Sequence, residues 1–176
     1  MIQLFLSIFL SSIFWQQEPV MAWNANDRLE WSDFKAAPQQ RAEVIAVTAS
    51  GLSFGYSTTR YPNGRIDYEF DVTAHFYPEK SWFMKDLVTN ITLSHERLHF
   101  DITELHARKF RKRVKTARFS SNIDAEIDVI YNQINKELRA MQKQYDTETS
   151  HSRLVEKQEE WNRQIQEELK KMEAYR

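Results

Sequence analysis

The residues of this chain best suited to chemistry lie in one short segment, His95-Glu96-Arg97-Leu98-His99, which has the pattern H-E-x-x-H. If the segment is helical, residues four apart lie on the same face, so the two imidazole rings can bind one metal ion. Glu96 then lies beside that ion and can accept a proton from a water molecule. The pattern arises by chance in roughly one sequence in a hundred of this length, in an amphipathic helix that happens to carry two histidines.

A catalytic zinc ion usually has three protein ligands and one open position, so a third ligand is needed. The chain contains no cysteine, and any metal must therefore be held by histidine and carboxylate side chains. On a continuing helix, Asp101 and Glu104 point away from the face of His99. His106 returns to that face but lies about 10 Å further along the axis. The third ligand is therefore expected from another element.

Two histidines outside this helix are candidates for the third ligand. His75 lies on the polar face of a predicted strand, where a lone histidine is more often a surface residue. His151 lies in a polar stretch between two predicted helices, from which a side chain can reach a helix partner, so we favour His151. A carboxylate, Asp146 or Glu148, is the alternative. Tyr145 is a candidate to donate a hydrogen bond to a developing oxyanion, and Asp146 to orient a ligand histidine, although a core tyrosine and a helix-cap aspartate are the commoner roles.

Three helices are predicted from apolar residues spaced three and four apart. The H-E-x-x-H segment belongs to the first, which Ser81 is expected to cap, and whose stripe is Leu87, Ile91, Leu98, Ile102 and Leu105. The second begins after Ser120-Ser121-Asn122, with the stripe Ile123, Ile127, Ile130, Ile134, Leu138 and Met141. The polar stretch from Gln144 to His151 breaks the pattern, and a last helix is expected over about Ser152 to Tyr175.

Strands are predicted before the first helix. Val44–Ala49 is rich in β-forming residues, and apolar and polar residues alternate from Ile66 to Phe76. Asn63-Gly64 lies between two such runs, which is typical of a hairpin turn. The sequence therefore predicts an α+β fold, in which a small antiparallel sheet with a hairpin around Asn63-Gly64 packs on the H-E-x-x-H helix and two further long helices.

The N-terminus has the pattern of a secretory signal peptide. Ile2–Phe14 is an apolar run too short for a membrane span of ~20 residues, and Val20-Met21-Ala22 suits signal cleavage. We expect residues 1–22 to be a cleaved signal and 23–176 to be a single domain, with about 150–176 as its C-terminal helix. An uncleaved anchor is the less favoured alternative. Losing Glu18 with the signal leaves 24 basic and 24 acidic residues, a balance that gives no general attraction to nucleic acid.

A basic segment ends the first helix. It contains Arg108, Lys109, Arg111, Lys112, Arg113, Lys115 and Arg118. Such a face can bind an anionic partner, such as lipid headgroups or an acidic wall polymer. The commoner explanation is a solvated helix end, where cations also suit the helix dipole.

Four separated motifs appear together in a recognisable order. They are Leu29-x-Trp31-Ser32-Asp33-Phe34, Ala74-x-Phe76-x-Pro78-x-x-Ser81-Trp82, His95-Glu96-x-x-His99-Phe100-Asp101-Ile102 and Tyr145-Asp146-x-Glu148-Thr149-x-His151. From Leu29 to about Ile165 the chain resembles the bacterial domain-of-unknown-function family 922, described as predicted secreted zinc-dependent proteases. The resemblance implies a zincin-like active-site helix and draws attention to His151, which falls in the last motif. The chain departs from the family at Arg97-Leu98, commonly Gln-Gly, and at Ser152, commonly Gly.

These features together predict a secreted or periplasmic zinc-dependent metallopeptidase that cleaves a peptide or protein substrate. His95, His99 and His151 would hold Zn²⁺, with Glu96 as general base. The strand Ile66–Phe76, if it borders the cleft, could bind an extended peptide by strand addition. One alternative is a non-catalytic, metal-stabilised envelope protein that binds an anionic partner through the basic segment Arg108–Arg118. Another is a metal-free protein whose core histidines are satisfied by hydrogen bonds.

Overall fold

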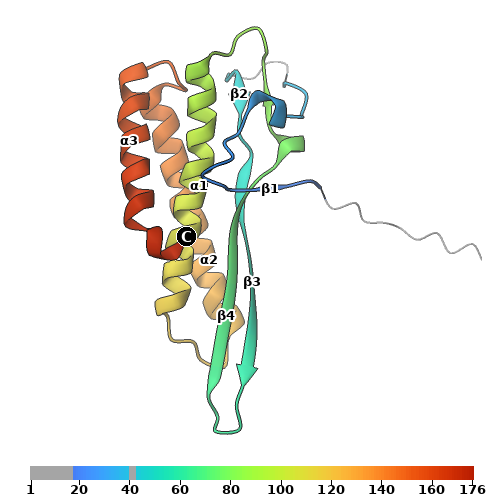
Figure 1. Ribbon diagram of the computed structural model, residues 1–176, viewed down its shortest axis with the longest axis vertical. Coiled ribbons are helices and arrows are strands. Elements are labelled where there is room, and N and C mark those ends of the chain that lie inside the picture. The colour runs from blue at the N-terminus through green and yellow to red at the C-terminus, as the bar shows by residue number, and fades with distance from the viewer. Residues whose placement is uncertain (1–17, 40–42) are drawn as a thin grey trace, which may run out of the picture.

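A computed structural model describes residues 18–39 and 43–176, so the predicted signal segment Ile2–Phe14 lies outside the described residues. Three helices, α1 (Asn90–Thr116), α2 (Ile123–Thr149) and α3 (Val155–Lys171), run side by side, and a long hairpin lies along α1 on the side away from α3 (Figure 1). The helix α1 therefore packs on the sheet and on both other helices. The predicted α+β fold is confirmed, with the H-E-x-x-H segment in the central helix.

The sheet is antiparallel, and its order is β1-β4-β3. Strands β3 (Ser50–Arg60) and β4 (Ile66–Phe76) pair along their whole length, and the short β1 (Met21–Ala22) adds to the end of β4. Gly64 adopts a φ of 82° at the hairpin turn, a conformation that glycine reaches without strain. The predicted hairpin and the predicted bounds of the Ile66–Phe76 strand are both confirmed.

A second, two-stranded sheet lies above the first half of α1. It pairs β2 (Ala46–Val47) with β5 (Trp82–Phe83). Only Thr48 and Ala49 separate β2 from β3, and residues 44–51 form one continuous stretch over α1. Short 3₁₀ helices at Trp31–Asp33, Pro78–Lys80 and Glu173–Tyr175 complete the structure.

The start of α1 differs from the prediction. Thr89, not Ser81, is the N-cap, and a reciprocal capping box joins it to Thr92. Ser81 instead accepts a hydrogen bond from Ala49 N and donates one to Tyr77 O, which fixes the turn before β5. The periodic spacing of Leu87 was misleading, because this residue is exposed before the helix begins.

The second helix also differs from the prediction, because α2 continues through the polar stretch to Thr149. Tyr145 and Thr149 are fully buried and extend its apolar stripe beyond Leu138. The helix then ends in a left-handed turn, and α3 begins at Val155. This extension carries Asp146 along the same helix that packs beside α1.

The basic segment Arg108–Arg118 is not one solvated face. Arg108 is buried and forms an ion pair of 2.9 Å with the buried Glu104, which also pairs with Arg111 at 3.0 Å. Arg113 pairs with Glu137 of α2 at 2.7 Å. Arg108 also donates to Leu169 O of α3, and Arg111 donates to Val72 O of β4. Three of these cations therefore join elements of the fold, and fewer remain for an anionic partner than the sequence suggested.

The residues just after the predicted signal cleavage site form hydrogen bonds with α1. Trp23 and Arg28 both donate hydrogen bonds to the buried carboxylate of Asp101, at 2.7–2.8 Å. Met21 and Ala22, placed in the signal segment by the sequence, form β1. Among the helices of residues 18–39 and 43–176, none is both long and apolar enough to cross a membrane.

Candidate metal centre

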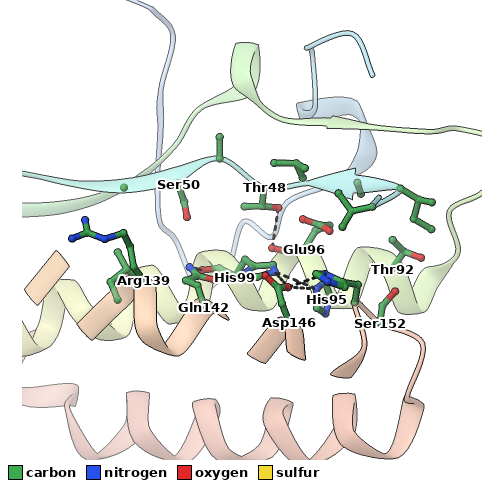
Figure 2. Close-up of a pocket in the computed structure, with 18 of the residues that line it drawn as sticks. Thr48, Ser50, Thr92, His95, Glu96, His99, Arg139, Gln142, Asp146 and Ser152 are labelled. Carbon is green, nitrogen blue, oxygen red and sulfur yellow. Dashed lines mark hydrogen bonds and ion pairs between the residues drawn. The ribbon is translucent and has the colours of Figure 1, made fainter. Parts of the chain in front are cut away.

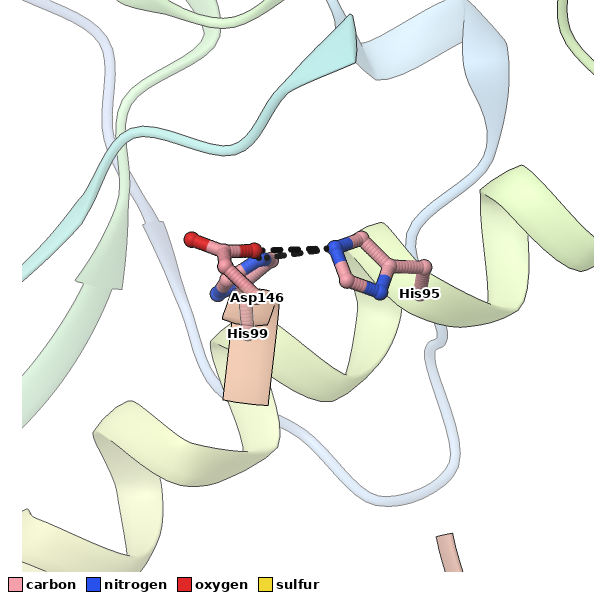
Figure 3. A group of neighbouring side chains, drawn as sticks. All are labelled: His95, His99 and Asp146. Atoms are coloured by element: carbon pink, nitrogen blue, oxygen red, sulfur yellow. Dashed lines mark hydrogen bonds and ion pairs between the residues drawn. The ribbon is translucent and has the colours of Figure 1, made fainter. Parts of the chain in front are cut away.

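The two histidines of the pentad lie together on the face of α1 that meets α2. His95 and His99 are one helical turn apart, and their rings meet edge to face with centroids separated by 4.7 Å. Their Nε2 atoms are 3.1 Å apart (Figure 3). The helix therefore does what the spacing predicts, and it directs two potential ligand atoms at one point.

The third member of the group comes from α2. Oδ1 of Asp146 lies 3.1 Å from Nε2 of His95 and 2.9 Å from Nε2 of His99. One ligand atom from each of these three residues lies within 4.8 Å of the others, so the group can hold a metal ion. The carboxylate alternative for the third position is thus the one that the fold brings into contact. Glu148, the other carboxylate considered, accepts a hydrogen bond from Trp161 instead.

Two glutamines hold the far sides of the imidazole rings. Nδ1 of His95 lies 2.9 Å from Oε1 of Gln158, which comes from α3. Nδ1 of His99 contacts Oε1 of Gln142, whose amide nitrogen donates to His99 O at 3.0 Å. Because an amide oxygen only accepts, each Nδ1 carries the proton and donates it. When neutral, each ring therefore presents its Nε2 lone pair to the centre of the group.

This arrangement fits a cation better than it fits a set of hydrogen bonds. Two imidazole lone pairs and a carboxylate oxygen face one another, and none of the three supplies a proton. Tetrahedral zinc with bonds of about 2.0–2.1 Å separates its ligand atoms by about 3.3 Å. The three observed separations, 2.9–3.1 Å, are close to that value. The residues therefore fit a tetrahedral metal site with one position left for water or substrate.

The electrostatics of the group point the same way. Burial favours the neutral form of Asp146, but the two adjacent histidines outweigh burial and hold the pKa of this carboxyl well below its ordinary value. Burial also favours the neutral form of His99, yet the hydrogen bond to Asp146 and the charge of Glu96 raise the pKa of this ring above its ordinary value. The site thus favours an anionic Asp146 together with a positive charge beside it.

Glu96 lies on the pocket side of α1, beside the two histidines (Figure 2). The residue is buried, and its Oε2 has no hydrogen-bond partner among the residues that the structure describes. A buried carboxylate oxygen without a partner is costly unless water, a cation or a substrate group satisfies it. Its position agrees with the proton-accepting role predicted for it.

His151 lies at the rim of the same pocket. Its Nδ1 is 3.5 Å from Oδ1 of Asp146, and 46% of its side chain is exposed. The left-handed turn that carries it has φ values of 48°, 52° and 69° at Ser150, His151 and Ser152. His151 is therefore near the metal group without being one of its three members, and its predicted role as a ligand stays a prediction. His75 lies on the sheet, where Nε2 contacts Ser53 Oγ at 2.7 Å.

Tyr145 is close to the site but faces away from the pocket. It is fully buried, its ring stacks on His95 with centroids 4.4 Å apart, and its hydroxyl lies within hydrogen-bonding distance of His95 O and of the amide group of Gln158. Burial raises the pKa of this hydroxyl. The geometry does not offer it to a substrate carbonyl, so Tyr145 positions His95 and Gln158 rather than acting on substrate.

A cavity of about 510 Å³ opens over the metal group. Its floor is formed by α1 and α2, and the extended stretch 44–51 runs along it (Figure 2). The strand predicted to bind a peptide, Ile66–Phe76, does not line this cavity; it is the middle strand of its sheet. The strands at the cavity are instead β2 and the start of β3, which Thr48 and Ala49 connect.

The fold and the site define an α+β protein with a candidate metal centre on an H-E-x-x-H helix. The chain belongs to the family described as bacterial protein of unknown function (DUF922), whose model matches residues 25–152. That match contains every residue of the metal group, and the family identified from its motifs is confirmed. No curated protein and no solved structure matches the chain.

Proposed function

We propose that this protein is a zinc-dependent metallopeptidase whose metal ligands are His95, His99 and Asp146. The observation that carries the proposal is the convergence of two Nε2 atoms and a carboxylate oxygen within 3.1 Å of one another, beside Glu96, whose Oε2 has no hydrogen-bond partner in the described part of the chain. A site of three nitrogen and oxygen ligands with an open position is typical of catalytic zinc.

Each residue of the site has a part in peptide hydrolysis. Zinc, when bound at such a site, lowers the pKa of a water molecule toward neutrality and polarises a carbonyl group. Glu96 accepts the proton of the attacking water and passes it to the leaving amine. Gln142 and Gln158 keep the ligand histidines in the Nδ1–H form.

The stretch 44–51 supports a peptide substrate in particular. Ile45 O accepts from Met84 N and Ala49 O accepts from Tyr77 N, so alternate residues face the neighbouring strands. The backbone groups of Ala46, Thr48 and Ser50 therefore point to the opposite, free edge above the cavity. Such an edge binds an extended peptide through main-chain hydrogen bonds.

The test is to load the purified protein with zinc and to compare it with Glu96→Gln on an unfolded protein pool. We expect the substitution to lower the rate of cleavage by about 10²- to 10⁴-fold and to leave the zinc content at one ion per chain. Glu159→Gln, on the exposed face of α3, is the matched control and should cleave as wild type. Equal cleavage by wild type and Glu96→Gln would refute the proposal.

A non-catalytic, metal-stabilised envelope protein is the second candidate. It would bind zinc stoichiometrically without hydrolysis, and substituting exposed cations such as Lys112 and Lys115 would weaken binding to an anionic surface. We also propose that the protein is secreted or periplasmic, on the basis of the signal-like sequence 1–22. Fractionation of expressing cells, with the N-terminus of the product sequenced, tests this.

A further inference from the structure

One cation lines the cavity away from the metal group. Arg139 lies on α2, seven residues before Asp146, and extends from that helix beside Gln142 toward the side where β3 begins (Figure 2). At 1.5 Å per residue, its Cα is about 10 Å along the helix axis from that of Asp146. This distance equals about three residues of an extended peptide.

The surroundings of Arg139 leave its charge available. It forms no ion pair and donates no side-chain hydrogen bond within residues 18–39 and 43–176. Its helical neighbours three and four residues away are Asn135, Lys136, Gln142 and Lys143, and no acidic residue lies between Glu137 and Asp146. Glu137 itself is paired with Arg113. The Arg139 end of the cavity is therefore cationic.

The direction of a bound peptide follows from the strand above the cavity. Thr48 Oγ1 donates to Glu96 O, and Ser50 Oγ contacts Thr103 Oγ1, so the strand runs in the same direction as α1. A peptide added antiparallel to this strand, the more stable pairing, runs the opposite way. Its N-terminal part then lies at the end of the cavity formed by Ser50, Gly51 and Arg139.

We propose that Arg139 forms a subsite that selects an acidic side chain about three residues on the N-terminal side of the cleaved bond. The proposal rests on the peptidase function proposed above and names its preferred substrates. A guanidinium group presents several donors in a plane that matches a carboxylate, which suits it to this recognition. Because Arg139 is exposed, the contribution is that of a screened surface pair, a preference of about fivefold that weakens at high salt.

The experiment has one arm that requires catalysis and one that does not. In the first, mass spectrometry locates cleavage sites in an unfolded protein pool, and Glu, Gln and Lys versions of the best peptide are compared by kcat/KM. In the second, fluorescein-labelled versions of the same peptides are titrated with zinc-loaded Glu96→Gln protein, and anisotropy measures their binding. If no cleavage occurs, Glu, Gln and Lys versions of a generic extended peptide are used instead. Wild type and Glu96→Gln are each combined with Arg139→Gln, Arg139→Glu or Lys143→Gln. Lys143→Gln removes a neighbouring exposed cation that does not line the cavity.

We expect the Glu peptide to be preferred about fivefold, with the preference lost in Arg139→Gln, reversed toward a Lys peptide in Arg139→Glu, and unchanged in Lys143→Gln. A preference that survives Arg139→Gln, or one that falls only on the C-terminal side of the cleaved bond, overturns the proposal. If the wild type cleaves nothing but the binding preference follows Arg139, the subsite stands and the peptidase function fails. If the protein cleaves peptides without any preference for the acidic side chain, the peptidase function stands and the Arg139 subsite fails.

Discussion

Replacing Asp146 by Asn should sharply weaken zinc binding, whereas replacing His151 by Gln should have little effect. Asn keeps the shape of the side chain but loses the charge that faces His95 and His99 at 3.1 and 2.9 Å. His151 touches the group only through Asp146, at 3.5 Å, and nearly half of its side chain is exposed. The two variants therefore distinguish the carboxylate from the third imidazole as metal ligand.

The magnitude follows from the number of ligands. Four-ligand zinc sites in small domains bind with about 10–16 kcal/mol, or about 2.5–4 kcal/mol per ligand. At about 1.4 kcal/mol for each factor of ten, losing the Asp146 ligand should lower the zinc affinity by about 10²- to 10³-fold. Losing an outer contact such as that of His151 should cost about tenfold or less.

The assay is competition for zinc against a chromophoric chelator at pH 7.5, with circular dichroism to show that each variant is folded. A further variant, His99→Gln, serves as the positive control, because every version of the site includes this ligand. If Asp146→Asn binds zinc as wild type does and His151→Gln loses it, the assignment of Asp146 is wrong. The original expectation of three histidines would then be correct.

Two further predictions concern stability. Burial lowers the pKa of His106 to about 4 from its ordinary 6.5, so the neutral ring stabilises the fold above pH 6.5. This contribution, about 3 kcal/mol, is lost as the pH falls from 6.5 to 4. Urea unfolding of wild type and His106→Gln at pH 7.5 and 4.5 should show a clearly smaller effect of pH on the stability of the variant, and equal effects would contradict this. Ser152→Gly removes a side chain from a residue with a φ of 69° and should raise the free energy of unfolding by up to about 1 kcal/mol. The control Ser121→Gly lies in a turn without positive φ and should not stabilise the protein. A less stable Ser152→Gly protein would argue against backbone strain at Ser152.

Local patterns in the sequence predicted much of the fold. The strand Ile66–Phe76 was found to the residue, because one face is buried on α1 and the period of two is unbroken. The position of the hairpin turn followed from Asn63-Gly64, since only certain residues suit such a turn. The start of α1 was missed because Leu87 happens to fit the helical period, and the capping box at Thr89 is formed by two threonines instead of the usual Thr and Glu.

The candidate site was predicted only in part, for a physical reason. His95, Glu96 and His99 are local on one helix, so spacing alone places them together. Asp146 was considered only as an alternative, because residues 144–151 look like a polar break, while Tyr145 and Thr149 in fact keep the helix buried. Gln142, one turn before Asp146 on the same face, could have been found once that helix was extended.

Gln158 and Arg139 could not have been predicted from the sequence. Gln158 reaches His95 from α3, and its position depends on how three helices pack, which leaves no local pattern. Arg139 resembles any exposed helical cation until the cavity beneath the stretch 44–51 is known. Long-range packing, and not residue type, gives both side chains their place in the site.

The packing around His95 and His99 also bears on the alternative in which these are ordinary core histidines. In that case each ring needs a donor for Nε2, and the neighbours of both Nε2 atoms are the other ring and the carboxylate of Asp146. A metal-free protein would therefore have to protonate one ring, as the raised pKa of His99 indicates, and keep a charged pair in the interior. Metal binding removes that need, because the cation supplies the positive charge and leaves both rings neutral. A proton and zinc then compete for the same histidine ring, so zinc binding should release about one proton per ion near neutral pH. Calorimetry in buffers of different ionisation enthalpy measures that proton, and its absence would favour rings that are neutral without metal.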